Sequence, residues 1–185
     1  MRERKYTAAA VAAKIEDFLT PILRRASLKV DIEVSEPAAR FPDFENPEIV
    51  VNFTGPDVDL VLENRAELLL ALEHLTLEML RVAPDEHARV VFDANDYRML
   101  RIEELRLSAA AAAERVRISR QPFRFGPMTS RERRILHLAV RELPGVRSES
   151  LGVGPHRGVV IYPADMPSLP ETPVRPAPAR GRGRR

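Results

Sequence analysis

The sequence predicts an α+β protein in which a three-stranded domain, a long connecting helix and a small α/β domain follow one another. Three observations support this fold class. Apolar residues recur at helical spacing in several segments, short runs rich in Val and Ile lie between them, and Pro and Gly mark the turns. The chain of 185 residues has room for one large domain or two small ones, and its 44% share of hydrophobic residues is enough to form cores.

The N-terminal part, residues 1–94, contains predicted elements in the order helix, strand, strand, helix, helix, strand. Apolar residues three and four positions apart define the helices, and Pro21 should kink or end the first of them. Alternating or continuous β-branched runs define the strands. The elements are expected at 5–26, 28–34, 48–53, 58–62, 65–82 and 88–93. Such an order predicts one sheet with its helices on one side.

The C-terminal part is predicted to begin with a long, polar-faced helix over 95–119, capped by Asn95 or Asp96. After Pro122 we expect a short strand, a second helix, a Gly-bounded loop and a β-branched strand that ends at Ile161. The predicted organisation is a three-stranded domain at 1–94, a connecting helix at 95–119, a small α/β domain at 120–162 and a disordered tail rich in Pro and Arg at 163–185.

The formal net charge of +2 conceals an asymmetry along the chain. Residues 1–119 carry a net charge of −6, whereas residues 120–162 hold eight Arg against three Glu and residues 163–185 carry +3. The C-terminal third is therefore a candidate polyanion-binding surface, and the N-terminal part is not. The alternative is that scattered arginines simply keep a small domain hydrated.

Several classes of chemistry are disfavoured by what the sequence lacks. It has no cysteine, which excludes disulfides and thiolate metal sites and fits a reducing cytoplasm. No apolar run approaches the roughly 20 residues that span a bilayer, so we expect no membrane insertion. The four histidines lack metal-ligand spacing, and we find no phosphate loop or nucleophile elbow. We therefore expect no metal, no cofactor and no enzymatic activity.

The strongest candidate site lies in the stretch from Gly126 to Ile161. Arg133 and His137 are four residues apart on a predicted helix, so both side chains emerge from one face. Arg157 stands just before the last predicted strand. Two guanidinium groups and an imidazole suit phosphate and base contacts better than catalysis. The structural alternative is an arginine in solvent and a histidine packed under the strands.

Further polar residues surround this site in the sequence. Arg131 and Arg134 lie around the same helix, where at least one should point away and contribute only to the electrostatic field. His156 lies in a Gly-Pro loop, a position that is more often functional than structural. Thr129 or Ser130 can cap the helix, whose free N–H groups also attract phosphate, and for Ser130 we favour capping alone.

Three strings carry a resemblance to a known family: DANDYRMLRIEEL, PMTSRERRILHLAV and PGVRSESLGVGPHRGVVI. They are similar to the Jag family, also called KhpB, of bacterial proteins that join a KH domain to an Arg-x-x-x-His (R-3-H) domain. The resemblance covers roughly residues 8–162. It implies binding of single-stranded nucleic acid, RNA before DNA, by a post-transcriptional or cell-envelope-linked regulator. It makes Arg133 and His137 the signature pair and Arg157 the basic residue before the last strand. The family usually has an additional N-terminal domain, which we expect this chain to lack.

The resemblance also makes residues 1–94 a KH-like domain of the type II order αββααβ. In the family, a Gly-x-x-Gly loop between two helices lets the nucleic-acid backbone approach closely. Here the aligned loop is Glu63, Asn64, Arg65 and Ala66. Side chains at both ends should block that approach and the carboxylate should repel phosphate, so we expect backbone clamping to be lost. The alternative function is a protein–protein adaptor whose KH-like domain docks a partner or a second copy.

The pattern around Arg157 departs from the family as well. Where relatives tend to carry a tyrosine and a second arginine, this chain has His156 and Gly158. One aromatic stacking group becomes an imidazole and one phosphate contact disappears, so we expect modest affinity. The main nucleic-acid site is still expected at Arg133 and Arg157.

Overall fold

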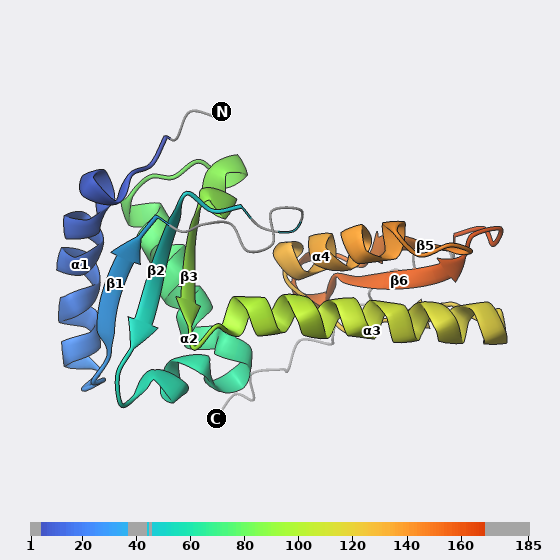
Figure 1. The fold of residues 1–185 in the computed structure, drawn as a ribbon, viewed down its shortest axis with the longest axis horizontal. Helices are drawn as coiled ribbons and strands as arrows, with labels where there is room; N and C mark the ends of the chain where they lie inside the picture. The colour runs from blue at the N-terminus through green and yellow to red at the C-terminus, as the bar shows by residue number, and fades with distance from the viewer. Residues whose placement is uncertain (1–4, 37–43, 45, 169–185) are drawn as a thin grey trace, which may run out of the picture. The chain divides into compact units, whose positions relative to one another are not determined.

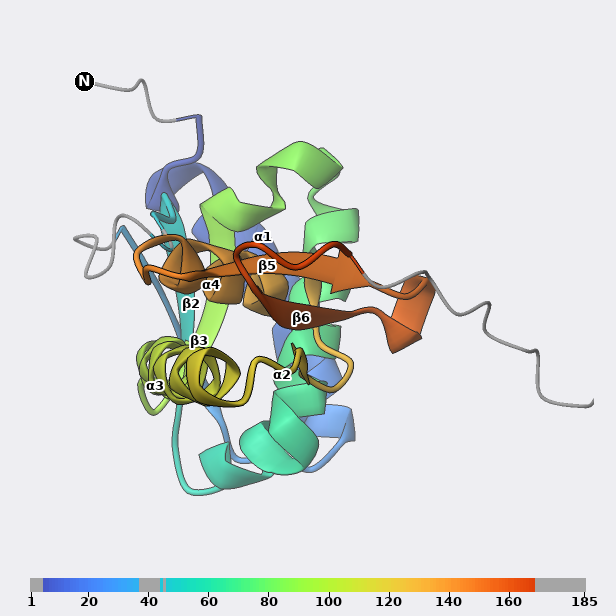
Figure 2. The ribbon, with the colours of Figure 1, turned by 90° about the vertical axis from the view of Figure 1, so that its right-hand side faces the viewer.

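The structure, a computed structural model, describes residues 5–36, 44 and 46–168. Within these ranges, the residues up to Arg101 form one compact unit and those from Ile102 form a second. Each unit combines helices with a three-stranded sheet (Figures 1 and 2). The predicted α+β class is therefore confirmed.

The long helix α3 (Tyr97–Ser119) contains the division between the two units. It begins two residues later than the predicted helix and ends where predicted. One side of it is buried, and the alanine run supplies half of that side because small side chains allow close packing. The buried residues are Ile102, Leu105, Ala109, Ala112, Ala113 and Val116. The expected domain limits at 94 and 119 stay a prediction.

The first helix of the N-terminal unit, α1 (Ala8–Arg25), buries one narrow stripe. Its apolar residues recur at every fourth position of the helix, a spacing that keeps side chains on one helical face. The buried residues are Val11, Ile15, Leu19 and Leu23. Pro21 is exposed and lies inside the helix, which continues to Arg25. The proline therefore does not end the helix.

The sheet of this unit has the order β1-β2-β3, formed by β1 (Asp31–Ser35), β2 (Ile49–Thr54) and β3 (Val90–Ala94). The first pair is antiparallel and the second is parallel. A parallel pair needs a crossover, which α2 (Val58–Met79) and the short 3-10 helix η1 (Pro84–Arg89) provide. The strands were predicted to within three residues at each end, whereas η1 was not predicted.

One hydrophobic core joins α1, α2 and the three strands. At its centre the rings of Phe53 on β2 and Phe92 on β3 lie 5.6 Å apart and are tilted by 44°. Both rings are fully buried, as are Ile15 and Leu19 of α1. Tilted aromatic pairs of this kind add about 1 kcal/mol beyond the area that they bury. The core fixes the sheet against both helices.

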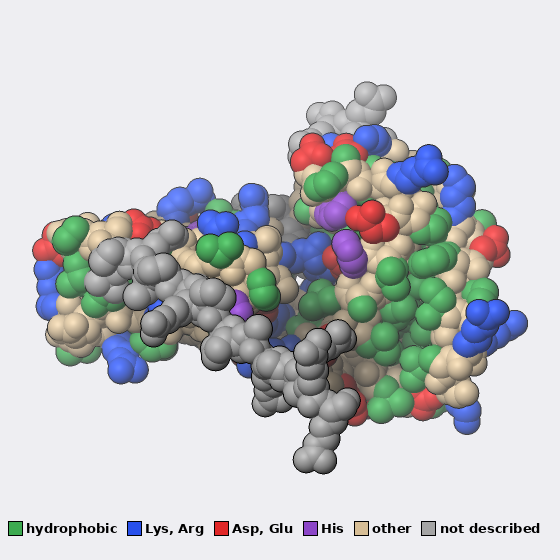
Figure 3. Space-filling view, turned by 180° about the vertical axis from the view of Figure 1, so that it is seen from behind, with side chains coloured by type: hydrophobic (Ala, Val, Ile, Leu, Met, Phe, Trp, Pro, Cys, Tyr) green, Lys and Arg blue, Asp and Glu red, His purple; other side chains and the backbone are tan. Residues whose placement is uncertain are grey.

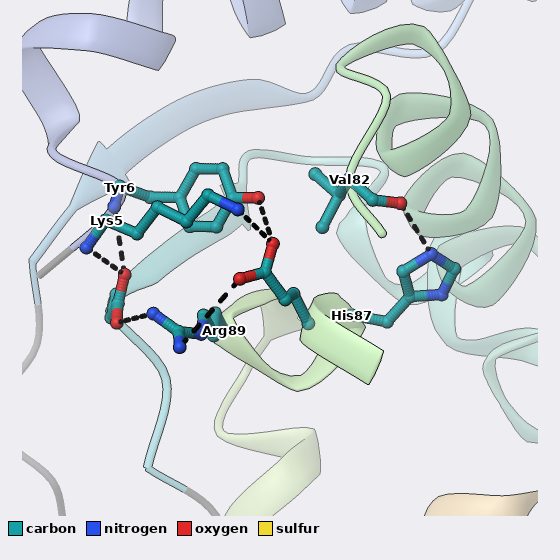
Figure 4. A network of polar contacts seen from close by, with 7 residues as sticks. Lys5, Tyr6, Val82, His87 and Arg89 are labelled. Carbon is teal, nitrogen blue, oxygen red and sulfur yellow. Dashed lines mark hydrogen bonds and ion pairs between the residues drawn. The ribbon is translucent and has the colours of Figure 1, made fainter. Parts of the chain in front are cut away.

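A polar network ties the start of the chain to the segments that precede β2 and β3 (Figure 4). The Glu48 carboxylate accepts from the backbone N–H groups of Lys5 and Tyr6, at 3.0 and 2.9 Å, and from Arg89 at 2.8 Å. The Glu86 carboxylate accepts from the Lys5 ammonium at 2.6 Å and the Tyr6 hydroxyl at 3.0 Å. The hydrogen bond with Lys5 is the main reason why the pKa of Glu86 is lowered. Three segments distant in sequence are thus joined by two carboxylates.

Part of the N-terminal unit's surface is apolar. Hydrophobic side chains gather on one of its faces (Figure 3), and on α2 the large apolar side chains that are most exposed are Leu60, at 46%, and Leu75, at 49%. An exposed apolar area of this kind is a feature of protein-binding surfaces when it is contiguous. No helix within the described residues has the length and apolar character needed to cross a membrane.

The C-terminal unit contains α4 (Ser130–Arg141) and an antiparallel sheet with the order β4-β6-β5. The short strand β4 (Phe123–Arg124) and the strand β6 (Gly158–Pro163) were both predicted. The strand β5 (Val146–Leu151) was not, because a Gly-bounded loop was predicted between the helix and the last strand. Its central residues are polar, so no apolar alternation marks it, and it forms by pairing with β6 along its whole length.

The residues that follow β6 fold back onto β5. The Ala164 N–H donates to the Gly145 carbonyl at 3.0 Å, the Arg147 guanidinium donates to the Met166 carbonyl at 2.7 Å, and the Ser168 hydroxyl donates to Glu149 at 2.6 Å. The prediction that the disordered tail begins at 163 is therefore wrong for its first residues. The rest of that tail, 169–185, lies outside the described residues.

Replacing Tyr162 by phenylalanine is expected to stabilise the C-terminal unit. The Tyr162 side chain is fully buried, and its hydroxyl has no hydrogen-bond partner within the described residues. Removing an unsatisfied buried hydroxyl should raise the free energy of unfolding by about 1 kcal/mol. The ring itself stays useful, because the Arg147 guanidinium lies 4.6 Å from its centroid. Thermal unfolding of Tyr162→Phe should show the gain. Tyr6→Phe, which loses a made hydrogen bond to Glu86, should show a loss, and a destabilised Tyr162→Phe variant would contradict the assignment.

Candidate nucleic-acid interface

The helix α4 begins with a capping box. The Thr129 hydroxyl accepts from the Glu132 N–H at 3.2 Å, and the Glu132 carboxylate accepts from the Thr129 N–H at 2.8 Å. Thr129 is therefore the cap, and the favoured role of Ser130 as a cap is wrong. The Ser130 hydroxyl instead accepts from the Arg133 guanidinium at 2.9 Å. The first turn of α4 thus serves both to start the helix and to hold an arginine.

Arg133 is held in a fixed, half-buried position. One terminal nitrogen of its guanidinium donates to the Met128 carbonyl at 2.8 Å and the other donates to Ser130. A guanidinium has five N–H donors, so part of its fork remains unused. No carboxylate within the described residues pairs with Arg133. The geometry leaves a positioned cation that can still donate to an anion.

Met128 links the backbone of Arg157 to the Arg133 guanidinium. The Met128 N–H donates to the Arg157 carbonyl at 3.1 Å, while the Met128 carbonyl accepts from Arg133. The loop before Arg157 is tight: Gly152 has φ = +94°, and a Cβ there would come within 2.7 Å of the His156 carbonyl oxygen. The Arg157 side chain is exposed and has no acidic partner within the described residues.

The two arginines act on one another electrostatically. Burial, and then the positive charge of Arg157, lowers the pKa of Arg133 from its ordinary value. Neither arginine has a carboxylate partner within the described residues, so a bound anion would relieve the repulsion between the two positive charges.

His137 bridges two serines of β5. Its Nδ1 lies 2.8 Å from the Ser148 hydroxyl oxygen and its Nε2 lies 2.8 Å from that of Ser150. Burial is the main cause of its lowered pKa, followed by the charges of Arg133 and Arg157. The ring is thus neutral at pH 7. Both ring nitrogens are already engaged by the serines, and a direct contact between His137 and a nucleic acid stays a prediction.

Comparisons with known proteins agree with this geometry. The model of the R-3-H domain matches residues 103–163. The protein named RNA-binding protein KhpB from Clostridium symbiosum is 29% identical over 80% of this chain and 64% of its own length. Proteins of the same name from Bacillus subtilis and Lactiplantibacillus plantarum are each 29% identical over 78% of this chain, and over 66% and 42% of their own lengths. The chain is thus similar to proteins of the Jag/KhpB family. It spans less than two thirds of the length of these relatives.

The remaining predicted site residues differ in their exposure. Arg134 is exposed and Arg131 is half-buried, as expected for two positions around one helix. His156 is exposed in the short helix η2 (Gly154–His156). Gly158, expected to mark a lost phosphate contact, is buried, and a Cβ there would lie 2.7 Å from the Gly126 carbonyl oxygen. This position therefore cannot hold a side chain unless the adjoining segment shifts.

The segment Glu63–Ala66, expected to stand in place of a Gly-x-x-Gly loop, interrupts α2 with a left-handed turn. Asn64, Arg65 and Ala66 have φ values of 51°, 64° and 59°, a region that costs an L-residue roughly 1 kcal/mol or more. The Tyr97 hydroxyl donates to the Arg65 carbonyl at 3.2 Å and helps to hold the turn. Ala66 is fully buried, so the expectation that side chains at both ends block an approaching backbone is wrong for Ala66. Only Glu63, which is exposed, can act in that way.

The sequence interpretation missed two residues of this site, Ser148 and Ser150. They lie two positions apart on β5, so both side chains emerge on the same face of the strand. A serine-rich polar segment is typical of a loop, which is why β5 and its serines were not considered. The one sequence signal for a strand here is the two-residue spacing that puts Val146 on the same face as the two serines.

Acidification is expected to destabilise the C-terminal unit through His137. Because folding lowers the pKa of His137 below 6.5, the unfolded chain binds a proton first as the pH falls. The stabilisation is fully present above 6.5 and is lost as the pH falls through the lower, folded pKa. Urea midpoints at about pH 7.5 and about pH 5.5 should differ for the native chain and differ less for His137→Gln. Equal pH dependence in the two proteins would contradict this origin.

Proposed function

We propose that this protein binds single-stranded RNA through the surface around Arg133 and Arg157. The observation that carries the proposal is that the Arg133 guanidinium and the Arg157 carbonyl both bond Met128, while neither arginine has a carboxylate partner within the described residues. Arg133 keeps unused N–H donors in a planar fork that matches phosphate oxygens. The relatives carry the name RNA-binding protein KhpB, which supports RNA as the anion. Arg134 and His156, both exposed, extend the surface.

The proposed role is binding without catalysis, by a post-transcriptional regulator that acts in the cytoplasm. Single-stranded DNA carries the same phosphates and is the second ligand class. The contacts proposed for RNA come from the chain's own side chains.

We assign the N-terminal unit to the KH-like type II fold. Its order of elements, and a sheet in which β1 and β2 are antiparallel while β2 and β3 are parallel, support this assignment. The turn at Glu63–Ala66 lacks glycine and exposes a carboxylate, so this unit contributes little to RNA affinity. The C-terminal unit is then the main binding surface.

Ultraviolet crosslinking of the full chain to a pool of single-stranded RNA tests the proposal. At about 50 mM salt the protein should retain the pool, and the crosslinked peptides should lie between Met128 and Arg157. Failure to retain RNA at this salt concentration would overturn RNA binding. Crosslinks confined to α2 would overturn the assignment of the surface.

A protein–protein adaptor is the second candidate function, favoured by the exposed Leu60 and Leu75 of α2. A second copy of the chain would cover these leucines. Size-exclusion chromatography with light scattering on the full chain measures this directly. A dimer that becomes monomeric in Leu75→Glu would support the adaptor role, and a monomeric native chain would count against self-association.

A further inference from the structure

The hydroxyls of Ser148 and Ser150 stand beside the arginine pair on an edge strand. In the sheet order β4-β6-β5, only one side of β5 is paired. Both serines are half-buried and share the face of β5 on which His137 lies. His137 and Arg133 lie about one helical turn apart on α4, and the Met128 carbonyl that accepts from Arg133 belongs to the residue whose N–H donates to the Arg157 carbonyl. Serine hydroxyls and guanidinium groups therefore belong to one site.

The other face of β5 is used differently. Arg147 and Glu149 point away from His137 and bind each other and the segment that includes Met166 and Ser168. Those contacts are internal to the C-terminal unit and give Arg147 and Glu149 their hydrogen-bond partners. The residues of both faces are half-buried, but the serine hydroxyls keep hydrogen-bonding capacity beyond their bonds to His137. The two faces of one strand thus separate a structural role from a surface that can meet a ligand.

The neutral imidazole fixes which hydrogen bonds the serines can offer. A neutral ring has one N–H donor and one acceptor nitrogen, so one serine must donate to the ring and the other must accept from it. In either tautomer the pair keeps one free O–H and more acceptor positions than donors. Such a pair can both donate to a ligand and accept from it.

This pattern selects among the groups of a nucleic acid. Phosphate oxygens only accept hydrogen bonds and are already suited to the two guanidinium groups. A ribose 2′-hydroxyl donates and accepts, and it lies next to a phosphate in every nucleotide of RNA. We infer that Ser148 and Ser150 bind the ribose 2′-hydroxyl of a nucleotide whose phosphate is held by Arg133 and Arg157. In this arrangement His137 is a positioning residue, and the inference rests on the proposed function.

The test compares ligands of one base sequence with the full-length native chain. A short single-stranded RNA is measured against its 2′-deoxy form, with deoxyuridine for uridine, and its 2′-O-methyl form by fluorescence anisotropy. RNA should bind roughly five- to tenfold more tightly than the deoxy form, the effect of one or two hydrogen bonds. The 2′-O-methyl form should also bind less tightly, because it cannot donate. Equal affinity for all three ligands would overturn the inference, and this arm needs no variant to fold.

The variant arm uses Ser148→Ala combined with Ser150→Ala, and separately His137→Ala. Each should lose most of the preference for RNA over the deoxy form while the affinity for the deoxy form stays within about twofold. A loss shared equally by RNA and DNA would overturn the inference. Ser168→Ala is the matched control, because that hydroxyl binds Glu149 on the other face, and it should keep the preference.

The two proposals fail in distinguishable ways. If the native chain binds neither RNA nor DNA, the proposed function fails and the inference fails with it. If binding is present and is lost in Arg133→Ala with Arg157→Ala, but RNA and DNA bind equally well, only the 2′-hydroxyl contact is overturned. A preference for RNA that the serine variants remove supports both.

Discussion

Replacing Arg133 and Arg157 together by alanine is expected to lower the affinity for single-stranded RNA on the order of 100-fold. Each guanidinium can supply charge-assisted hydrogen bonds worth about 1.5–3 kcal/mol, and neither arginine has a carboxylate partner in the described residues. Each phosphate contact that is lost should also reduce the slope of log affinity against log salt by about 0.7. A titration of RNA binding at several salt concentrations measures both effects.

The single variants and a control sharpen this prediction. Arg133→Lys keeps the charge but cannot bond Met128 and Ser130 in the same fork, so it should recover only part of the affinity. Arg141→Ala removes a cation from the other end of α4, where it pairs with Glu142 at 3.3 Å, and should change affinity by less than about threefold. Equal losses for Arg141→Ala and Arg133→Ala would mean that only the general charge of the helix matters.

Removing one partner of the Glu73–Arg98 ion pair is expected to destabilise the N-terminal unit by about 3–5 kcal/mol. The two side chains are only 10% and 11% exposed. The Glu73 carboxylate also accepts from the Phe92 N–H at 3.0 Å, and the Arg98 Nε donates to the Phe92 carbonyl at 2.6 Å. Either single alanine variant leaves a buried charge together with a backbone group of β3 that has lost its partner.

Urea unfolding of the full chain measures the loss of stability. Hydrogen exchange at the Phe92 amide then shows that the loss occurs in the N-terminal unit. Glu73→Leu combined with Arg98→Met should be less destabilised than either single alanine variant, because no charge is left unpaired. The exposed pair Arg106 and Glu103 is the matched control, and Arg106→Ala should cost less than about 1 kcal/mol. A cost as small for Glu73→Ala would show that the buried pair is dispensable.

The sequence by itself determined the order of most elements and proposed the two arginines of the candidate site. Helical spacing located α1 and α4 because burial of one face repeats along the local sequence. The β-branched run located β6, whose residues are all buried. Arg133 and Arg157 were found from their place in matched strings and from the positive charge around them. These are local signals, so they can be recognised without knowledge of the fold.

Only the tertiary structure decided how that site is built. The strand β5 forms because β6 pairs with it, and its polar residues carry no local sign of a strand. The partners of His137, Ser148 and Ser150, exist only once β5 is placed against α4. The burial of Ala66 likewise depends on a left-handed turn that no sequence pattern without glycine predicts. The physical reason is the same in each case: hydrogen-bond partners and burial are set by contacts between distant segments, whereas sequence patterns report only the neighbours along the chain.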